Sequence, residues 1–360
     1  MENKLYSVIA GTGSYIPSQV IKNEDFLKNS FFSAEGEPLK KTNEEIINKF
    51  KDITEIEERR YVEDKYVASD IGSIAAQNAL ETANIDAETL DKIIVAHNFG
   101  DISKETGRTD ILPSLAAKIK YKLKIKNPYC GAYDVLFGCP GWIEAMIQAD
   151  FYIKSGAAKR VLVIGTETLS RISDPHDIDS MIYSDGAGAV VLEARESNQP
   201  EGIISHISRS DTYENAWFLH MGSSYNPEVD AREQYLKMNG RKVYEYALNT
   251  VPATVKKAIE SANIDISDVK KVLIHQANAK MDHAILKRLF KLYGLKTVPD
   301  NIMPLTISKL GNNSVATVPV LFDLLMREKL DNHRINSGDY FVFTSVGAGM
   351  NINAIVYKMP

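Results

Sequence analysis

The chain has 360 residues, a formal net charge of −5 at neutral pH and only two cysteines. The acidic balance excludes a nucleic-acid binder that depends on overall positive charge, and two cysteines exclude a disulfide-bonded scaffold. The length suits two domains or one duplicated domain. No run of about 18 apolar residues could span a bilayer, and residues 1–4 show no signal-peptide pattern. We therefore expect a cytoplasmic protein with no nucleic-acid or membrane partner.

Strands and helices alternate along the first half of the chain. Apolar periodicity predicts strands at 5–11, 92–97, 160–166 and 187–193, another strand before Cys139, and helices at 69–83, 114–123 and 142–156. Gly11 and Gly13 are interpreted as a turn that ends the first strand, because the third glycine of a dinucleotide-binding loop is missing. The segment 23–65 is polar and charge-rich, and we expect a surface loop at 34–38.

The second half repeats this order of elements. Strands are predicted at 203–208, 271–274, 340–345 and 351–357, helices at 243–262, 281–292 and 315–329, and an extended segment at 303–312. The segment 91–98 (DKIIVAHN) also resembles 269–276 (VKKVLIHQ). A polar break at 195–202 separates the two copies. The sequence therefore predicts an α/β protein with two similar halves, 1–198 and 199–360.

Cys139 lies where a strand pattern changes into a helix pattern. The apolar segment 133–137 breaks at Gly138, and helical spacing resumes at Trp142. At a helix start, unpaired N–H groups and the helix dipole favour a thiolate. Pro140 suits the first helical position, where its missing N–H costs nothing. Because a single cysteine is more often a core residue, this pattern alone leaves a reactive and a buried structural Cys139 both open.

Two further polar side chains occupy positions typical of a ligand site. His275 follows the strand 271–274, and Asn312 lies in a turn that precedes a helix. Ligands of α/β proteins usually bind at the carboxyl ends of strands. If the halves pack around a pseudo-twofold axis, Cys139, His275 and Asn312 would share one pocket. Each residue also has a structural interpretation, His275 as a buried strand-end residue and Asn312 as a turn and helix cap.

Several motifs together resemble the β-ketoacyl-acyl-carrier-protein synthase III family. They are 132–135 (AYDV), 138–141 (GCPG), 275–278 (HQAN), 311–314 (GNNS) and 345–349 (SVGAG). Each motif is weak alone, but all occur in the family's order over nearly the whole chain. The resemblance implies a homodimer with a thiolase-like fold, in which duplicated α/β halves form a layered α-β-α-β-α core.

The same resemblance implies a decarboxylative Claisen condensation by a ping-pong mechanism. Cys139 would take an acyl primer from acyl-CoA or an acyl carrier protein. His275 and Asn312 would bind the thioester carbonyl of malonyl-carrier protein and stabilise its enolate, and the backbone N–H groups of Cys139 and Ala348 would form the oxyanion hole. The β-ketoacyl product would enter fatty-acid biosynthesis. No metal or redox cofactor is expected, and the loop 174–179 is interpreted as a turn rather than a metal site.

Other positions concern the substrate and the carrier protein, again by resemblance. The acyl pocket would be lined by Met238, Trp142 and Leu112, the last reaching across the dimer interface into the partner's pocket. A leucine at 112, where the family often has an aromatic residue, predicts a primer longer than acetyl. Carrier-protein docking would use basic residues that could otherwise be solvated helix positions: Arg241, Lys280 and Lys287.

Departures from the family pattern keep other functions open. The aromatic residue and the arginine that contact the adenine of CoA in the family fall on Lys49 and Ile53, so CoA and carrier-protein loading both stay open. With Pro140 and Trp142 after the nucleophile, these changes also allow a ketosynthase of specialised lipid or polyketide synthesis, such as one that joins two acyl chains into dialkylresorcinols. A third candidate is a non-catalytic ketosynthase-like partner subunit. The presence of all three catalytic residue types argues against it.

Overall fold

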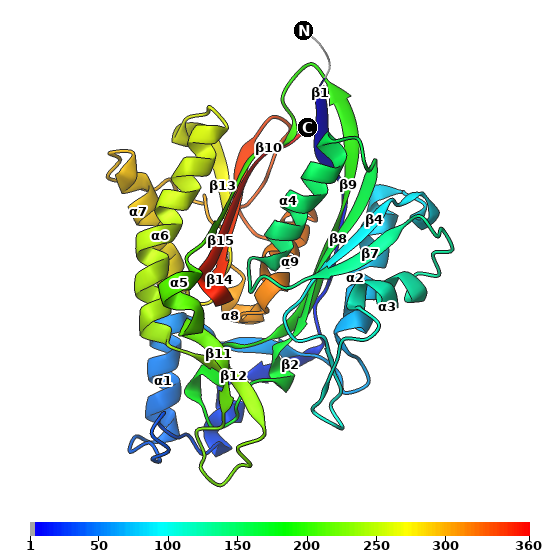
Figure 1. The fold of residues 1–360 in the computed structure, drawn as a ribbon. Coiled ribbons are helices and arrows are strands. Elements are labelled where there is room, and N and C mark those ends of the chain that lie inside the picture. The colour runs from blue at the N-terminus through cyan, green and yellow to red at the C-terminus, as the bar shows by residue number, and fades with distance from the viewer. Residues whose placement is uncertain (1–3) are drawn as a thin grey trace.

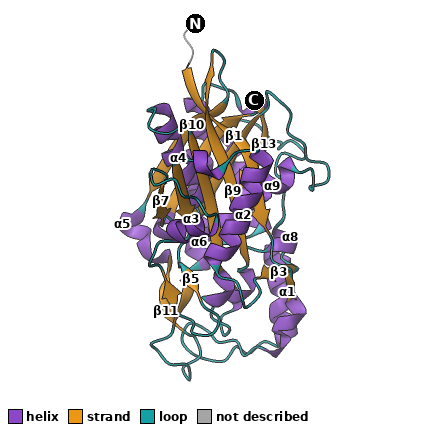
Figure 2. Ribbon diagram, turned by 90° about the vertical axis from the view of Figure 1, so that its right-hand side faces the viewer, coloured by secondary structure: helices purple, strands orange, loops and turns teal. Residues whose placement is uncertain are grey.

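Two β-sheets and three layers of helices form the core of the protein (Figure 1). The computed structural model describes residues 4–360. Residues 1–3 belong to the start of the chain, where we expect no signal peptide, and lie outside the described residues. The first sheet has the strand order β1-β9-β8-β4-β7, and the second has the order β10-β15-β14-β13. The start of β1 and the C-terminus lie at one end of the molecule, and α1 and β11 lie at the other (Figures 1 and 2).

The strands of each sheet come from one side of the polar break. The first sheet contains β1 (Lys4–Tyr15), β4 (Lys92–Ala96), β7 (Gly131–Val135), β8 (Arg160–Thr168) and β9 (Asp185–Ser197). The second contains β10 (Gly202–Ser210), β13 (Val269–Ile274), β14 (Tyr340–Gly347) and β15 (Asn351–Lys358). Three small two-stranded sheets are formed by β2 (Gln19–Lys22) with β3 (Glu58–Tyr61), β5 (Asp101–Ile102) with β6 (Thr109–Asp110), and β11 (Leu219–Ser223) with β12 (Gln234–Met238).

The helices cover both outer faces of the sheets and fill the space between them. The longer helices are α1 (Asn43–Thr54), α2 (Ala68–Ala83), α3 (Leu115–Lys122), α4 (Gly141–Lys154), α6 (Gly240–Ser261), α7 (Ala279–Leu292) and α9 (Thr317–Met326), and the short ones are α5 (Thr212–Asn215) and α8 (Ile307–Leu310). Helices α2 and α3 pack on the first sheet, α6 and α7 on the second, and α4 and α9 lie between the sheets. The predicted layered α-β-α-β-α, thiolase-like fold is confirmed.

The two sheets share one pairing pattern. In the first, β4 runs parallel to β8 and β8 antiparallel to β9; in the second, β13 runs parallel to β14 and β14 antiparallel to β15. The similar segments 91–98 and 269–276 therefore place β4 and β13 at equivalent positions. The chain passes from one sheet to the other between Ser197 and Gly202. The domain boundary at residue 198 stays a prediction.

Helices α4 and α9 are apolar on nearly all sides because sheets cover both of their faces. Their side chains form one cluster with the inner faces of the two sheets. Trp142 of α4 is fully buried there, and its ring meets Phe343 of β14 edge to face with the ring centroids 5.6 Å apart. Among residues 4–360, no helix is long and apolar enough to cross a membrane.

The predicted turn at Gly11 and Gly13 is wrong, because β1 continues to Tyr15. A Cβ on Gly11 would lie 2.4 Å from the backbone N of Ala83, and one on Gly13 would lie 2.3 Å from the carbonyl oxygen of Ala75. Both contacts belong to α2. The two glycines therefore let α2 lie directly on the strand.

Helix α1 and the four-residue helices α5 and α8 are not among the elements predicted from the sequence. Helix α1 lies inside the polar segment 23–65, and its start carries a capping box in which Thr42 and Glu45 satisfy each other's backbone N–H groups. Helix α8 interrupts the segment expected to be extended at 303–312. Helix α1 matters for function because it lines a cavity described below.

Candidate active site

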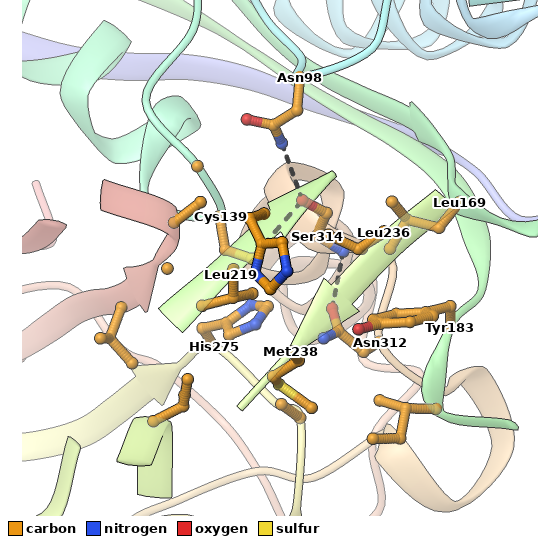
Figure 3. Close-up of a pocket in the computed structure, with 18 of the residues that line it drawn as sticks. Asn98, Cys139, Leu169, Tyr183, Leu219, Leu236, Met238, His275, Asn312 and Ser314 are labelled. Carbon is orange, nitrogen blue, oxygen red and sulfur yellow. Dashed lines mark hydrogen bonds between the residues drawn. The ribbon is translucent and has the colours of Figure 1, made fainter. Parts of the chain in front are cut away.

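A cavity of about 220 Å³ lies where loops from both sheets meet (Figure 3). Its lining includes Cys139, His275, Asn312 and Ala348. Cys139 follows β7, His275 follows β13 directly, and Ala348 follows β14 directly. Asn312 follows α8, and its backbone pairs with that of Tyr183. The structure thus brings the three predicted catalytic side chains together, as the strand-end argument predicts.

Two glycines allow the backbone segments around Cys139 and Ala348 to approach each other closely. Gly138 has a φ of +66°, and a Cβ there would lie 2.6 Å from the backbone N of Ala348. A Cβ on Gly347 would lie 2.5 Å from the backbone N of Cys139. No side chain fits at either position. Because of this close approach, the backbone N–H groups of Cys139 and Ala348 lie on adjoining segments of the cavity wall.

The environment of the Cys139 sulfur favours a thiol in the resting site. Burial raises the pKa of Cys139 to about 11, a hydrogen bond from Ser314 Oγ lowers it, and the charge of Glu167 raises it. Ser314 Oγ lies 3.6 Å from Cys139 Sγ. At Cys139 the cost of burying a charge therefore outweighs the effect of the helix start, which by itself favours a thiolate.

His275 and Asn312 offer neutral hydrogen-bond donors to the cavity. His275 is 3% exposed, and burial lowers its pKa to about 4, so the imidazole is neutral at pH 7. Its Nδ1 has no hydrogen-bond partner among residues 4–360. Asn312 Oδ1 accepts the N–H of Ser314 at 2.8 Å. This bond fixes the amide orientation and leaves the Nδ2 group, a donor, for other partners.

The cavity also contains polar residues that the sequence prediction missed. Asn98, Tyr183, His220 and Ser314 line it, and Glu167 lies behind Asn98, whose N–H groups it accepts. The Tyr183 hydroxyl is buried and has no partner within the described residues. Asn98 follows β4 at a strand end, and Ser314 belongs to the GNNS motif, so both carried a usable signal. Nothing in the spacing marked the other three.

The predicted acyl-pocket residues have different outcomes. Met238 lines the cavity, as predicted. Trp142 does not, and that prediction is wrong: its ring points into the core between the sheets. Leu112 is 86% exposed and does not line the cavity of its own chain, so its place in a partner's pocket stays a prediction. The predicted docking residues are all exposed on α6 and α7: Arg241, Lys280 and Lys287.

A second cavity, of about 510 Å³, adjoins the first. Both cavities are lined by Ile182, Met238, Val243, Ala277 and Met281. The second extends between α1, α6 and α7, and its wall includes Lys49 and Ile53, the positions where the family resemblance predicts contacts to CoA. The reactive cavity therefore continues toward the surface near α1.

The aspartate-rich loop 174–179 is held by an internal ion-pair cluster. Lys237 Nζ lies 3.2 Å from Asp177 Oδ2 and also pairs with Asp174. All three side chains are buried. The ammonium group of Lys237 thus occupies the position between these carboxylates.

The layered fold and the cysteine, histidine and asparagine in one cavity define the class: thiolase-fold condensing enzymes. Sequence models of 3-oxoacyl-[acyl-carrier-protein] synthase III match residues 133–212, and models of its C-terminal part match residues 259–359. β-Ketoacyl-[acyl-carrier-protein] synthase III of Thiobacillus denitrificans is 34% identical over 345 residues, which cover 96% of each chain. A synthase III of Vibrio vulnificus is 34% identical over 348 residues, covering 96% of this chain and 97% of the relative.

The crystal structure of the synthase III from Thermus thermophilus superposes with a TM-score of 0.81 at 29% identity, covering 98% of this chain and 99% of that one. The chain belongs to the β-ketoacyl-acyl-carrier-protein synthase III family, and the predicted resemblance is confirmed. Family membership makes it an acyltransferase that acts as a condensing enzyme.

Proposed function

We propose that the protein transfers an acyl primer to Cys139 and condenses it with malonyl-carrier protein to give a β-ketoacyl-carrier protein in fatty-acid biosynthesis. One observation carries this proposal: Cys139, His275, Asn312 and Ala348 line the same cavity. The curated relatives named above are synthases of this type. Neither a specialised lipid or polyketide ketosynthase nor a non-catalytic partner subunit has better support.

In the transfer step, Cys139 Sγ attacks the carbonyl carbon of the primer thioester. Since Cys139 is a thiol at rest, its proton leaves as the C–S bond forms and passes to the departing thiolate of the donor. The carbonyl oxygen becomes an oxyanion, and we assign its stabilisation to the backbone N–H groups of Cys139 and Ala348. The acyl group is then held as a thioester on Cys139.

In the condensation step, the thioester carbonyl of the malonyl group would accept hydrogen bonds from His275 and from Asn312 Nδ2. Loss of carbon dioxide leaves an enolate whose oxygen these donors stabilise. The enolate carbon attacks the acyl carbonyl on Cys139, the C–S bond breaks, and the thiolate takes a proton from water. A neutral His275 suits this role, because it donates a hydrogen bond and its ring needs no change of charge.

The second cavity is the proposed path for the thioester arm. Lys41 and Lys49 line it. Arg241 and Lys280 each lie next to a lining residue, at the starts of α6 and α7. With Lys287 one to two turns further along α7, these cations would dock the acidic carrier protein and hold its phosphate.

We further propose a cytoplasmic homodimer that needs no metal or redox cofactor. Strand β7 is an edge of the first sheet. Near it, three large apolar side chains are more than half exposed in the single chain: Leu112, Leu136 and Phe151. An uncovered edge strand with exposed apolar residues favours pairing with a second copy. Leu112 would then reach the partner's acyl pocket, where a leucine suits a primer longer than acetyl. Gel filtration with light scattering measures the molar mass in solution and so tests whether the protein is a dimer.

A primer panel tests the proposed reaction. Purified protein is mixed with malonyl-carrier protein and with acetyl to medium-chain thioesters of CoA or carrier protein, and the β-ketoacyl-carrier protein is measured by mass spectrometry. We expect decarboxylative condensation and a primer longer than acetyl. No β-ketoacyl product from any primer contradicts the proposed reaction. Fastest turnover with acetyl, with negligible turnover of medium chains, contradicts only the longer primer.

A further inference from the structure

A hydrogen-bonded chain of three side chains, Glu167, Asn98 and Ser314, ends at the Cys139 sulfur. Figure 3 shows its last two links, from Asn98 to Ser314 and from Ser314 to Cys139. Ser314 Oγ lies 3.6 Å from Cys139 Sγ, and Asn98 Nδ2 lies 3.1 Å from Ser314 Oγ. Behind them, Glu167 Oε2 accepts the Nδ2–H of Asn98 at 2.9 Å and its backbone N–H at 3.0 Å. Ser314 is 3% exposed and Glu167 is fully buried. None of these three residues takes part in the transfer and condensation steps proposed above.

The Asn98 amide has a defined direction in this chain. Glu167 Oε2 accepts both the backbone N–H and the Nδ2–H of Asn98, and an ionised carboxylate can only accept, so the Asn98 NH₂ faces Glu167. The second hydrogen of that NH₂ then points at Ser314 Oγ. This oxygen accepts the Asn98 N–H, and the Ser314 hydroxyl in turn donates to Cys139 Sγ.

We propose that the Ser314 hydroxyl is a catalytic hydrogen-bond donor that stabilises negative charge on Cys139 Sγ during attack and release, and that Asn98 and Glu167 are positioning residues that fix its direction. The proposal deepens the proposed function, since it rests on Cys139 as the acyl carrier. A hydrogen bond to a charged group is about twice as strong as one between neutral groups. The donor therefore contributes more to the charged sulfur than to the resting thiol.

The charged and titratable groups around this chain shift the pKa values of Glu167 and Cys139 in opposing directions. Burial raises the pKa of Glu167 to about 7, and the neighbouring His97 and Asp185 affect it in opposite directions. His97 Nδ1 accepts the N–H of Gly100 at 3.0 Å, and His97 Nε2 lies 2.9 Å from Asp134 Oδ2. The neutral imidazole of His275 and the Tyr183 phenol also lie in the wall of this cavity. Ionised Glu167 opposes charge on Cys139, while Ser314 favours it.

Alkylation of Cys139 by iodoacetamide, followed by mass spectrometry between pH 6 and 10, tests the proposal without any condensation. Below the pKa of the thiol, the rate follows the thiolate fraction. We expect Ser314→Ala to lower the rate about tenfold, because losing a hydrogen bond to a charged group raises the pKa by about one pH unit. Asn98→Ala should lower it less. Glu167→Gln should raise it, since a negative charge is lost, and should remove an inflection near pH 7.

A matched control and a folding check accompany these variants. Ser205 of β10 is also buried, and its Oγ donates to the carbonyl oxygen of Ala258 at 2.7 Å, away from the cavity. Ser205→Ala should alkylate at the wild-type rate, and the Cys139→Ala variant corrects for reaction at Cys130. Thermal unfolding establishes that each variant is folded. If Ser314→Ala does not fold, Asn98→Ala decides.

The outcomes separate the parts of the proposal. A folded Ser314→Ala variant with wild-type alkylation overturns the role of the hydroxyl. A normal rate in Asn98→Ala overturns the positioning role. If the alkylation pattern is as expected but wild-type enzyme forms no β-ketoacyl product, the hydrogen bond stands and the proposed function fails. If product forms and the variants alkylate normally, the reverse holds.

Discussion

Replacing Gly347 by alanine should disable the active site by separating two backbone segments. The new Cβ would lie 2.5 Å from the backbone N of Cys139, whereas ordinary contact begins at 3.4 Å, so the segments must move apart by about 0.9 Å. Gly347 has a φ of −168°, an extended conformation that alanine adopts freely, so the effect is steric. A misplacement of about 1 Å, like the loss of one oxyanion donor, lowers kcat about a hundredfold or more.

A second glycine provides the control for this prediction. In Gly13→Ala, the Cβ would lie 2.3 Å from the Ala75 carbonyl oxygen in α2, away from the cavity. Both variants should lose about 1–3 kcal/mol of unfolding free energy in urea, because both overpack the interior. Only Gly347→Ala should lose kcat per folded molecule. Wild-type kcat in a folded Gly347→Ala variant would refute the placement of the oxyanion hole at Cys139 and Ala348.

Three other predictions follow from burial and charge. Burial lowers the pKa of His275 from 6.5 to about 4, so between these pH values the unfolded chain binds more protons than the folded one. At pH 5 this difference lowers the unfolding free energy by about 2 kcal/mol. His275→Gln should therefore weaken the loss of stability at acid pH, as measured by urea unfolding. An unchanged loss would contradict a neutral, buried imidazole. Trp142→Ala should cost about 3–5 kcal/mol without changing primer preference; altered preference at normal stability would restore Trp142 to the acyl pocket. Lys280→Glu should raise KM for malonyl-carrier protein about fivefold, with a smaller rise for Lys287→Glu; equal KM values would argue against docking there.

The order of strands and helices and the meeting of Cys139, His275 and Asn312 in one cavity could be predicted from the sequence, for a physical reason. Regular alternation of apolar segments sets which pieces become strands and helices. Residues that directly follow strands then gather at one edge of each sheet, which is why Cys139 and His275 converge although far apart in the chain. Asn312 reaches the same cavity from a turn. Periodicity and strand direction thus suffice for the order of elements and the strand-end positions, whereas the layered core and the catalytic roles came from the family resemblance.

The failures concern properties that depend on packing in three dimensions. Gly11 and Gly13 resemble a turn locally, but close approach of α2 explains them. The resemblance placed Trp142 in the acyl pocket, but its ring packs in the core between the two sheets, which a position in the sequence does not reveal. The pKa of Cys139 depends on burial, which no helix-start rule contains. Ser314 has a φ of +52°, a left-handed backbone conformation that its place in the sequence does not reveal.

Intact-protein mass spectrometry tests the central claim most directly. Wild-type enzyme and Cys139→Ala are mixed with a panel of acyl-CoA and acyl-carrier-protein thioesters, and malonyl-carrier protein is then added. We predict one acyl adduct on the wild type, none on Cys139→Ala, and loss of the adduct as β-ketoacyl-carrier protein appears. An adduct that also forms on Cys139→Ala, or one that persists after malonyl-carrier protein is added, would contradict Cys139 as the carrier of the condensing acyl group.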